Sequence, residues 1–358
     1  MNKNLFVLTL SQIFSFTAAP VTVFLSGIIG SQISPIKSLS TLPMSISVVG
    51  IAIGAVIASK VMSITGRKTG FIIASVGNSI VSICAAYSIF IQNFSLFCFV
   101  NFFLGVGMAF THQYRFAAAE SVDKDKVPKA ISIILLGGIV SAVIGPGLAN
   151  YAKDIVSNHL YVGSYLSLAV LTFLPSIFFL FYKNTKKIEI NIKYSGRNYL
   201  ELISQPRYLQ AIVASAFGYA IMTFLMTATP LSMHVMEGMS LSKTSVVIQI
   251  HVAAMFLPSL ITGNLVKKFG HSKIMYAGVS LYSITVIASF FDQSFLNYMF
   301  ALIFLGFGWN FLFISGTSLL VLTYKEEEKF RAQGLNDFIV YSVHAIGSLS
   351  AGILIVLT

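Results

Sequence analysis

The sequence predicts an all-α polytopic membrane protein, and three observations support this prediction. Of the 358 residues, 56% are hydrophobic and only 10% are charged, whereas a soluble domain contains about 25% charged residues. Long apolar stretches alternate with short basic ones, which is typical of a chain that crosses a bilayer repeatedly. Basic loops at an anionic membrane surface explain the net charge of +11, so no nucleic-acid partner is expected.

Eleven apolar runs are long enough to span a bilayer, which takes about 20 apolar residues per helix. The first run lies close to the N-terminus, where a signal peptide would also lie. Its apolar pattern continues to about Gly30, so we expect a first spanning helix instead. The eleven runs are residues 5–30, 39–62, 70–92, 95–119, 129–151, 159–182, 208–232, 243–266, 273–291, 295–322 and 334–357.

The distribution of lysine and arginine predicts how these helices are oriented. If the N-terminus is cytoplasmic, the inner loops contain almost all of the basic residues, including Arg67, Lys68 and the polar segment after the sixth run. The outer loops then contain only Lys37, Lys153 and Lys243. This asymmetry follows the positive-inside rule, so we expect a multi-pass protein with a cytoplasmic N-terminus.

Two short echoes indicate an internal duplication. FLGVGMAF at 103–110 resembles FLGFGWNF at 304–311, and SKVMSITGRK at 59–68 resembles GNLVKKFGHS at 263–272. The two offsets, 201 and 204 residues, are nearly equal. Parallel repeats of this kind are a transporter architecture in which the substrate site lies between the halves. The predicted units are residues 1–182 (six-helix N-terminal half), 183–207 (cytoplasmic linker) and 208–358 (C-terminal half of five helices).

The spanning runs, the basic loops, the duplication and the central linker together resemble the major facilitator superfamily over essentially the whole chain. Between its second and third helices, that family carries a glycine, an aspartate and then Gly-Arg-Arg/Lys. Here Gly66, Arg67 and Lys68 match. Ser63 stands at the position of the aspartate, and Ser59 at that of the leading glycine. The resemblance implies two six-helix repeats in a bacterial inner (cytoplasmic) membrane.

A second motif of the same family is matched in part. The stretch SAVIGPGLAN in the run 129–151 is similar to the glycine–proline motif of the family's fifth helix. Gly145 and Pro146 match, whereas other residues replace three of its further glycines. The family has twelve helices and this chain has eleven runs. We therefore expect the twelfth helix to be missing, either by truncation or as a natural variant.

Polar residues interrupt the apolar run 95–119 in the stretch HQYRFAAAE, residues 112–120. His112 and Arg115 are three residues apart and share one face of a helix. The resemblance implies that this helix lines a central cavity, where the two side chains would hold a polar or anionic part of a substrate. In the alternative interpretation, Arg115 reaches to the inner surface and His112 makes a structural hydrogen bond.

Another group of residues is predicted to latch the cytoplasmic gate. In the family, the loop arginine pairs with an acid at the inner end of the fourth helix, and Arg67 and Glu120 occupy those positions. A solvated surface carboxylate is the alternative for Glu120. Asp337 is expected to pair with Lys60 or Arg67 in place of the missing aspartate, or else to lie at a helix N-terminus. The predicted latch residues are Gly66, Arg67, Lys68, Glu120 and Asp337.

In the C-terminal half, Trp309 and Asn310 lie in the middle of the run 295–322. Trp309, the only tryptophan, is suited to stacking on a flat substrate, and core packing is the alternative. Gln249 and His251 are interpreted as further buried polar groups, and His251 could titrate in a proton cycle. The predicted cavity residues are His112, Arg115, Gln249, His251, Trp309 and Asn310.

Several functional classes are excluded by what the sequence lacks. It contains no ATP-binding loop and no nucleophile–base arrangement, so we expect neither an enzyme nor a cofactor. Cys84 and Cys98 lie in apolar runs and indicate no metal site. We predict a monomeric secondary transporter that moves a small polar or anionic organic solute by alternating access, driven by a proton or substrate gradient. The alternatives are a multidrug-type exporter and a non-transporting sensor or partner protein.

Overall fold

The protein is described by a computed structural model that covers residues 2–36, 39, 42–184, 196–233 and 237–357. Regular structure within these ranges is entirely helical. Eight helical stretches among them are long and apolar enough to cross a membrane. The all-α membrane class is thereby confirmed, whereas the count of eleven spanning helices stays a prediction.

The helices fall into two groups along the chain, separated by a stretch of the predicted linker, residues 185–195, that lies outside the described residues. The N-terminal helices are α1 (Lys3–Ser15), α2 (Ala18–Ile33), α3 (Leu42–Phe90), α4 (Phe94–His112), α5 (Tyr114–Glu120), α6 (Val127–Tyr151) and α7 (Val162–Phe178). The C-terminal helices are α8 (Tyr199–Ile203), α9 (Pro206–Leu231), α10 (Leu241–Phe256), α11 (Ser259–Phe269), α12 (His271–Ala288), α13 (Phe295–Val321) and α14 (Lys329–Leu357).

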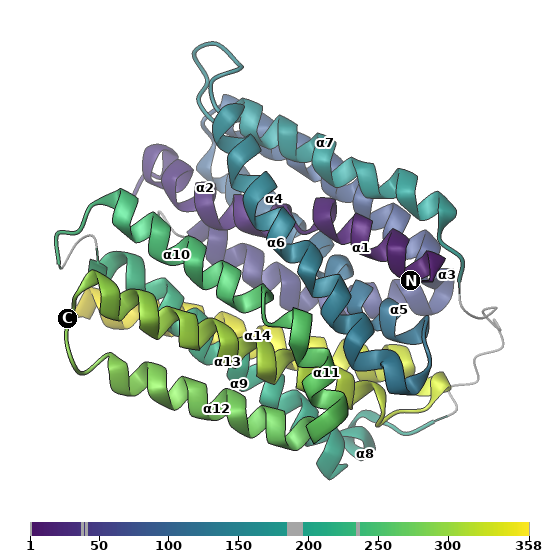
Figure 1. Ribbon diagram of the computed structural model, residues 1–358. Helices are drawn as coiled ribbons and strands as arrows, with labels where there is room; N and C mark the ends of the chain where they lie inside the picture. Colours follow the sequence, from purple (N-terminus) through teal and green to yellow (C-terminus); the bar gives the residue numbers. More distant parts are fainter. Residues whose placement is uncertain (1, 37–38, 40–41, 185–195, 234–236, 358) are drawn as a thin grey trace.

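Figure 1 shows the long helices side by side, with the two chain termini at opposite ends of the bundle. The N-terminal helices, purple to teal, fill most of the upper part of the view, and most of the C-terminal helices fill the lower part. We call the end at which α1 begins, near α5 and α8, the Arg67 end; it lies to the right in Figure 1. The side chains described below as a candidate gate come from this end.

Gly66 and Gly270 have nearly the same backbone conformation, at two positions that the sequence echo aligns. Gly66 bends α3 with a φ of 81° and a ψ of 165°. Gly270 joins α11 to α12 with a φ of 84° and a ψ of 159°. Such a positive φ favours glycine, because a side chain is strained there. Equal bends at equivalent places are what a duplicated unit requires, and the duplication itself stays a prediction.

Two glycines bring the backbones of α3 and α4 into direct contact. A Cβ atom on Gly105 would overlap the carbonyl oxygen of Ser47, and one on Gly50 would overlap that of Phe102. Lipid is as apolar as the helix surface, so close packing of this kind is a main source of attraction between spanning helices. The crossing of α3 and α4 therefore depends on the absence of these two side chains.

Replacing Gly105 by alanine is expected to lower the free energy of unfolding by about 1–3 kcal/mol, because overpacking forces the backbones apart. Denaturant or thermal unfolding of the protein in detergent measures the effect. Gly77→Ala is the matched control, since a Cβ atom there meets no other group within 4 Å. That control should be neutral or slightly stabilising, as expected for alanine in a helix. Equal effects of the two substitutions would contradict the packing argument.

From residue 196 onwards, an ion pair between Arg197 and Glu328 fastens the chain to the C-terminal helices. The Arg197 guanidinium donates hydrogen bonds to Glu328 at 2.8 and 2.5 Å and to the carbonyl oxygen of Thr323 at 3.1 Å. Arg331 in turn donates to the carbonyl oxygen of Arg197. The hydrogen bonds from Arg197 lower the pKa of Glu328 to about 2. This fastening therefore depends on an ionised Glu328.

Acid should weaken this fastening. A carboxyl group whose pKa is lowered by folding adds stability above its unfolded pKa of 4.5 and loses it as the pH falls towards about 2. We expect Glu328→Gln to reduce the fall of the unfolding midpoint between pH 5 and pH 3, because the variant has no proton to take up there. The unfolding midpoint is measured across that range. Glu327→Gln, at a neighbouring exposed position, should keep the slope of the unchanged protein.

Candidate functional site

A buried network of charged and amide side chains is centred on Arg67, which is only 3% exposed. Its guanidinium donates to both carboxylate oxygens of Glu120, at 3.2 and 2.5 Å. It also donates to the amide oxygens of Gln113, at 2.9 Å, and Gln333, at 2.5 Å. Arg67 directly follows the bend at Gly66 and begins the second part of α3. The structure thus brings Arg67 against Glu120 as the sequence motif predicted.

A second ion pair lies beside the first and joins the two groups of helices. Arg115 of α5 pairs with Asp337 of α14, and the two side chains are 3% and 0% exposed. Gln113 donates to the other oxygen of Asp337 at 3.0 Å, and Arg115 donates to the hydroxyl of Tyr341 at 3.3 Å. Buried charges are stable only when they are paired and hydrogen-bonded in this way.

The second ion pair corrects two predictions. Arg115 does not reach the inner surface, as its alternative interpretation requires, because it is buried and pairs with Asp337. Asp337 pairs with Arg115 rather than with Lys60 or Arg67, and it is linked to Arg67 only through Gln113. The physical reason is the rotation of α14, which turns Asp337 towards the junction of α4 and α5.

Further contacts close the Arg67 end across the same boundary. Gln333 donates to Glu120 at 3.2 Å, and the Lys329 ammonium lies 3.7 Å from that carboxylate. The Ser59 hydroxyl donates to the carbonyl oxygen of Phe330. Lys68 takes no part, since its ammonium donates to the carbonyl oxygen of Leu180 at 2.7 Å, within the N-terminal helices. Its predicted place in the latch is therefore corrected.

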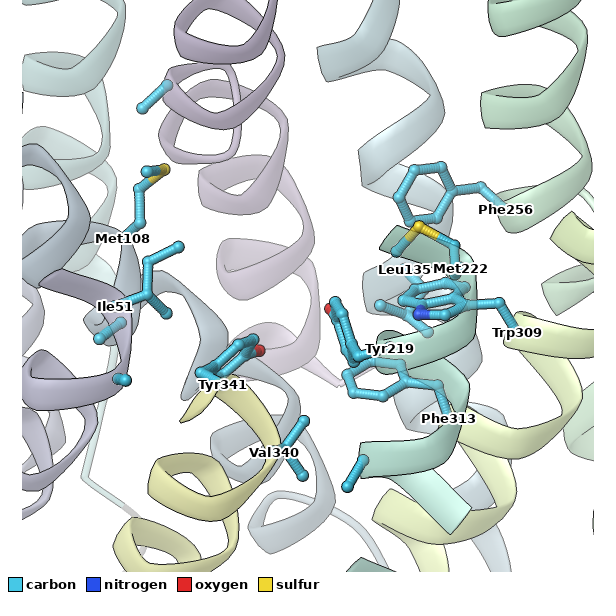
Figure 2. Packing of buried hydrophobic residues seen from close by; sticks show 14 of the residues in the cluster. Ile51, Met108, Leu135, Tyr219, Met222, Phe256, Trp309, Phe313, Val340 and Tyr341 are labelled. Atoms are coloured by element: carbon cyan, nitrogen blue, oxygen red, sulfur yellow. The ribbon is translucent and has the colours of Figure 1, made fainter. Parts of the chain in front are cut away.

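An aromatic cluster lies next to the ion pairs, and we define it as Tyr219, Phe256, Trp309, Phe313 and Tyr341. Figure 2 shows these rings together with Ile51 and Met108 from the N-terminal helices. Trp309 is 2% exposed and stacks on Phe313, with ring centroids 4.9 Å apart and planes 19° apart. Its indole nitrogen, Nε1, has no hydrogen-bond partner among the described residues. The cluster thus pairs ring faces with a buried donor that lacks an acceptor.

Other polar groups border this cluster. His112 packs at a tilt against Tyr341 with ring centroids 4.6 Å apart, and His344 packs on Tyr219 with centroids 5.0 Å apart. The guanidinium of Arg115 lies 4.6 Å from the Phe313 ring, so the cluster and the second ion pair are in direct contact. His112 is half-buried at the boundary between the two groups of helices. A movement of these rings would therefore also move the ion pair of Arg115 and Asp337.

Besides His112 and Arg115, which border this cluster, three further predicted cavity residues are not members of it. Asn310 is fully buried and donates to Met255 and Ser259, at 2.7 Å each, which joins α13 to α10 and α11. His251 lies 2.8 Å from the carbonyl oxygen of Leu302 and joins α10 to α13 in the same manner. Both side chains hold helices together rather than line a shared site.

Gln249 is exposed, so its prediction as a buried group is wrong. Residues two apart on an α-helix point in nearly opposite directions, and His251 occupies the packed face of α10.

In the fifth-helix motif, Gly145 lies against the start of α2, where a Cβ atom would be 3.2 Å from the carbonyl oxygen of Thr17. The side chain of Pro146 lies outside the described residues.

Sequence reasoning did not single out four residues of the site. Gln113 lies within the stretch HQYRFAAAE, where an amide inside an apolar run was a usable signal, and Gln333 directly precedes the run 334–357. Tyr219 and Tyr341 are two of fifteen tyrosines and carry no local signal. Only the packing of α9 against both α13 and α14 brings Tyr219 to Trp309 and to Tyr341.

The all-helical fold, with eight described stretches long and apolar enough to cross a membrane, defines a polytopic membrane protein. The profile of the Major Facilitator Superfamily matches residues 5–348, and the chain belongs to that superfamily. This family is one of transporters rather than enzymes, so the expectation of a non-enzyme is confirmed.

Individual proteins and solved structures are similar to this chain. The riboflavin transporter RfnT of Brucella anthropi is 35% identical over 355 residues, which are 99% of this chain and 89% of that protein. YdeG of Bacillus subtilis, an uncharacterized MFS-type transporter, is 27% identical over 99% of this chain and 86% of its own. The structure of the E. coli transporter FucP in the outward conformation has a TM-score of 0.72 at 15% identity, over 98% of this chain and 90% of that one.

Proposed function

We propose that this chain is a secondary transporter that works by alternating access, with halves 1–182 and 208–358 that rock about the linker. The observation that supports this most is the buried network at the Arg67 end. It joins α3 and α5 to α14 through side chains, and such contacts can break and re-form as rigid bodies move. With a cytoplasmic N-terminus, the protein described here is closed towards the cytoplasm.

The same proposal includes eleven spanning helices. Each of the pairs α1–α2, α4–α5 and α10–α11 then counts as one interrupted helix. Helix α3 counts as two, because Gly66 bends it where a loop between spans is expected. Such interruptions are tolerated in a membrane where neighbouring helices satisfy the freed backbone groups.

We propose a flat heteroaromatic solute as the substrate. The relative RfnT is named as a riboflavin transporter, and riboflavin has a flat ring with hydrogen-bond acceptors along its edge. In this chain the aromatic cluster offers faces for stacking, and Trp309 Nε1 offers a donor without an acceptor. Arg115 was expected to bind an anionic group, but Asp337 already neutralises it. An uncharged polar solute therefore fits the site better than an anion.

For the driving force we propose protons, with Asp337 as the group that takes one up. A protonated Asp337 no longer holds Arg115 by charge, and Arg115 contacts both Tyr341 and the Phe313 ring. Protonation would therefore loosen the Arg67 end and shift the aromatic cluster at the same time. A buried carboxylate at the boundary of two moving units is typical of proton relays in membrane transporters.

Uptake of radiolabelled riboflavin into proteoliposomes, with and without a pH gradient, tests this function. We expect Trp309→Phe to weaken substrate affinity about tenfold, because it keeps a ring but removes the donor of a buried hydrogen bond, a loss of about 1.4 kcal/mol. Phe290→Leu is the control, at a position that is 84% exposed. It should leave uptake unchanged.

The outcomes separate the alternatives. Uptake of cationic drugs but not of riboflavin would favour a multidrug-type exporter over the proposed substrate. Binding without flux of any solute would favour a non-transporting sensor or partner protein. If uptake does not depend on the pH gradient in either direction, proton coupling is wrong and facilitated transport remains.

A further inference from the structure

The bend at Gly270 creates a place equivalent to the Arg67 site, but with different chemistry. After Gly66, the next residue is Arg67, whose head group is neutralised by Glu120. After Gly270, with the same backbone angles, the next residue is His271. Its Nε2 atom is buried and has no hydrogen-bond partner among the described residues. The N-terminal site thus contains its own anion, and its counterpart does not.

A pocket of about 660 Å³ occupies this equivalent place. It lies between the start of α9, the start of α12 and the end of α13. The described residues that line it include no carboxylate. Its polar lining is Gln205, Arg207, His271, Ser272, Lys273 and Thr323.

The positive charges of the pocket have no acidic partner within the described part of the chain. Arg207 donates only to neutral groups, the amide oxygen of Gln210 at 3.0 Å and the hydroxyl of Ser272 at 3.2 Å. Lys273 is exposed and forms no ion pair with a described residue. Lys267, near the end of α11, is by contrast paired with Asp125 at 3.1 Å. The carboxylate of the following loop, Glu328, is held by Arg197.

We propose that this pocket binds a phosphate group, which supplies the anion that the N-terminal half obtains from Glu120. A guanidinium held in place by Gln210 and Ser272 is suited to two phosphate oxygens, and Lys273 adds a point charge. The first turn of α12 has no side-chain cap, so its backbone N–H groups face the same anion. Leu319 and Leu322 line the remaining wall and suit the carbon part of an organic phosphate.

Two kinds of molecule supply such a phosphate group: a phospholipid of the inner leaflet, through its head group, and a soluble phosphate ester. Thermal unfolding of the full chain in a non-ionic detergent distinguishes them. One arm adds phosphatidylglycerol against an equal amount of phosphatidylcholine, and the other adds glycerol 1-phosphate against chloride at equal ionic strength. The pocket variant is Arg207→Gln with Lys273→Gln. The control, with the same change in charge outside the pocket, is Lys60→Gln with Lys124→Gln; both of these lysines are exposed.

A ligand of the folded state raises the unfolding midpoint by mass action. We expect a rise of about 2 °C or more in the unchanged protein and in the control, for at least one arm, and its loss in the pocket variant. A rise with phosphatidylglycerol alone assigns the site to a lipid, and a rise with glycerol 1-phosphate assigns it to a soluble ester. No rise in either arm overturns the proposal. The proposal is also overturned if the unfolding midpoint rises as much in the pocket variant as in the unchanged protein, or if the control loses the rise as the pocket variant does. None of these outcomes bears on which solute the protein carries.

Discussion

Replacing Arg115 by methionine is expected to lower the free energy of unfolding by about 3–5 kcal/mol, because the change leaves a buried carboxylate without its counter-charge. Asp337 is fully buried, and the remaining groups that hydrogen-bond to it, Gln113 and Asn336, are neutral. Neither can replace the lost charge. The measurement is denaturant unfolding of the purified protein in detergent, at neutral pH.

The double variant Arg115→Met with Asp337→Asn is the decisive companion of this experiment. It removes both charges and keeps the two side chains at similar volume, so most of the lost stability should return. An Arg115→Met protein within about 0.5 kcal/mol of the unchanged one, the size of an ordinary surface effect, would show that Asp337 is not held ionised by Arg115. The proposed role of Asp337 in proton coupling would then lose its basis.

Replacing Arg67 by glutamine is expected to open the Arg67 end. The shorter, neutral side chain gives up the ion pair with Glu120 and the bond to Gln333, so the closed arrangement loses stability relative to the open one. A cysteine placed at Ser59, which is buried against α14, reports the opening by its reaction with a water-soluble maleimide. We expect about a tenfold faster reaction, which corresponds to a shift of about 1.4 kcal/mol.

This experiment needs two controls. Cys84 and Cys98 are first replaced by serine, since both are free thiols. Lys68→Gln then serves as the matched variant, because Lys68 is the neighbouring loop cation and its ammonium bonds to Leu180 instead of crossing the boundary. Its labelling rate should equal that of the unchanged protein. If Arg67→Gln and Lys68→Gln react at the same rate, the network does not act as a gate.

The contacts within the N-terminal half were the most predictable part of the site. Gly66 and Arg67 belong to a local motif, and in the family that the chain resembles this arginine pairs with an acid at the inner end of the fourth helix, where Glu120 lies. The all-helical membrane class was equally accessible, because apolar runs of spanning length have few alternatives in a bilayer.

Contacts across the boundary were not predictable in the same manner. Whether Asp337 meets Lys60, Arg67 or Arg115 depends on the rotation of α14 about its own axis, and a helix in lipid has too weak an amphipathic pattern to reveal that rotation. Gln249 was misplaced for a related reason, since hydropathy alone does not tell which face of α10 packs on α13. Neutral aromatic residues such as Tyr219 add no charge signal at all.

The buried network at the Arg67 end has a consequence for the insertion of the growing chain into the membrane. Its C-terminal members all come from α14, the last of the described helices, and Asp337 follows Arg115 by 222 residues. A ribosome that adds about 5–20 residues per second covers that distance in about 10–45 s. Arg67 meets Glu120 after only 53 residues and is neutralised early. Arg115, by contrast, enters the bilayer as a cation without a counter-charge and has none until Asp337 is synthesised. During this interval the nascent chain depends most on the insertion machinery.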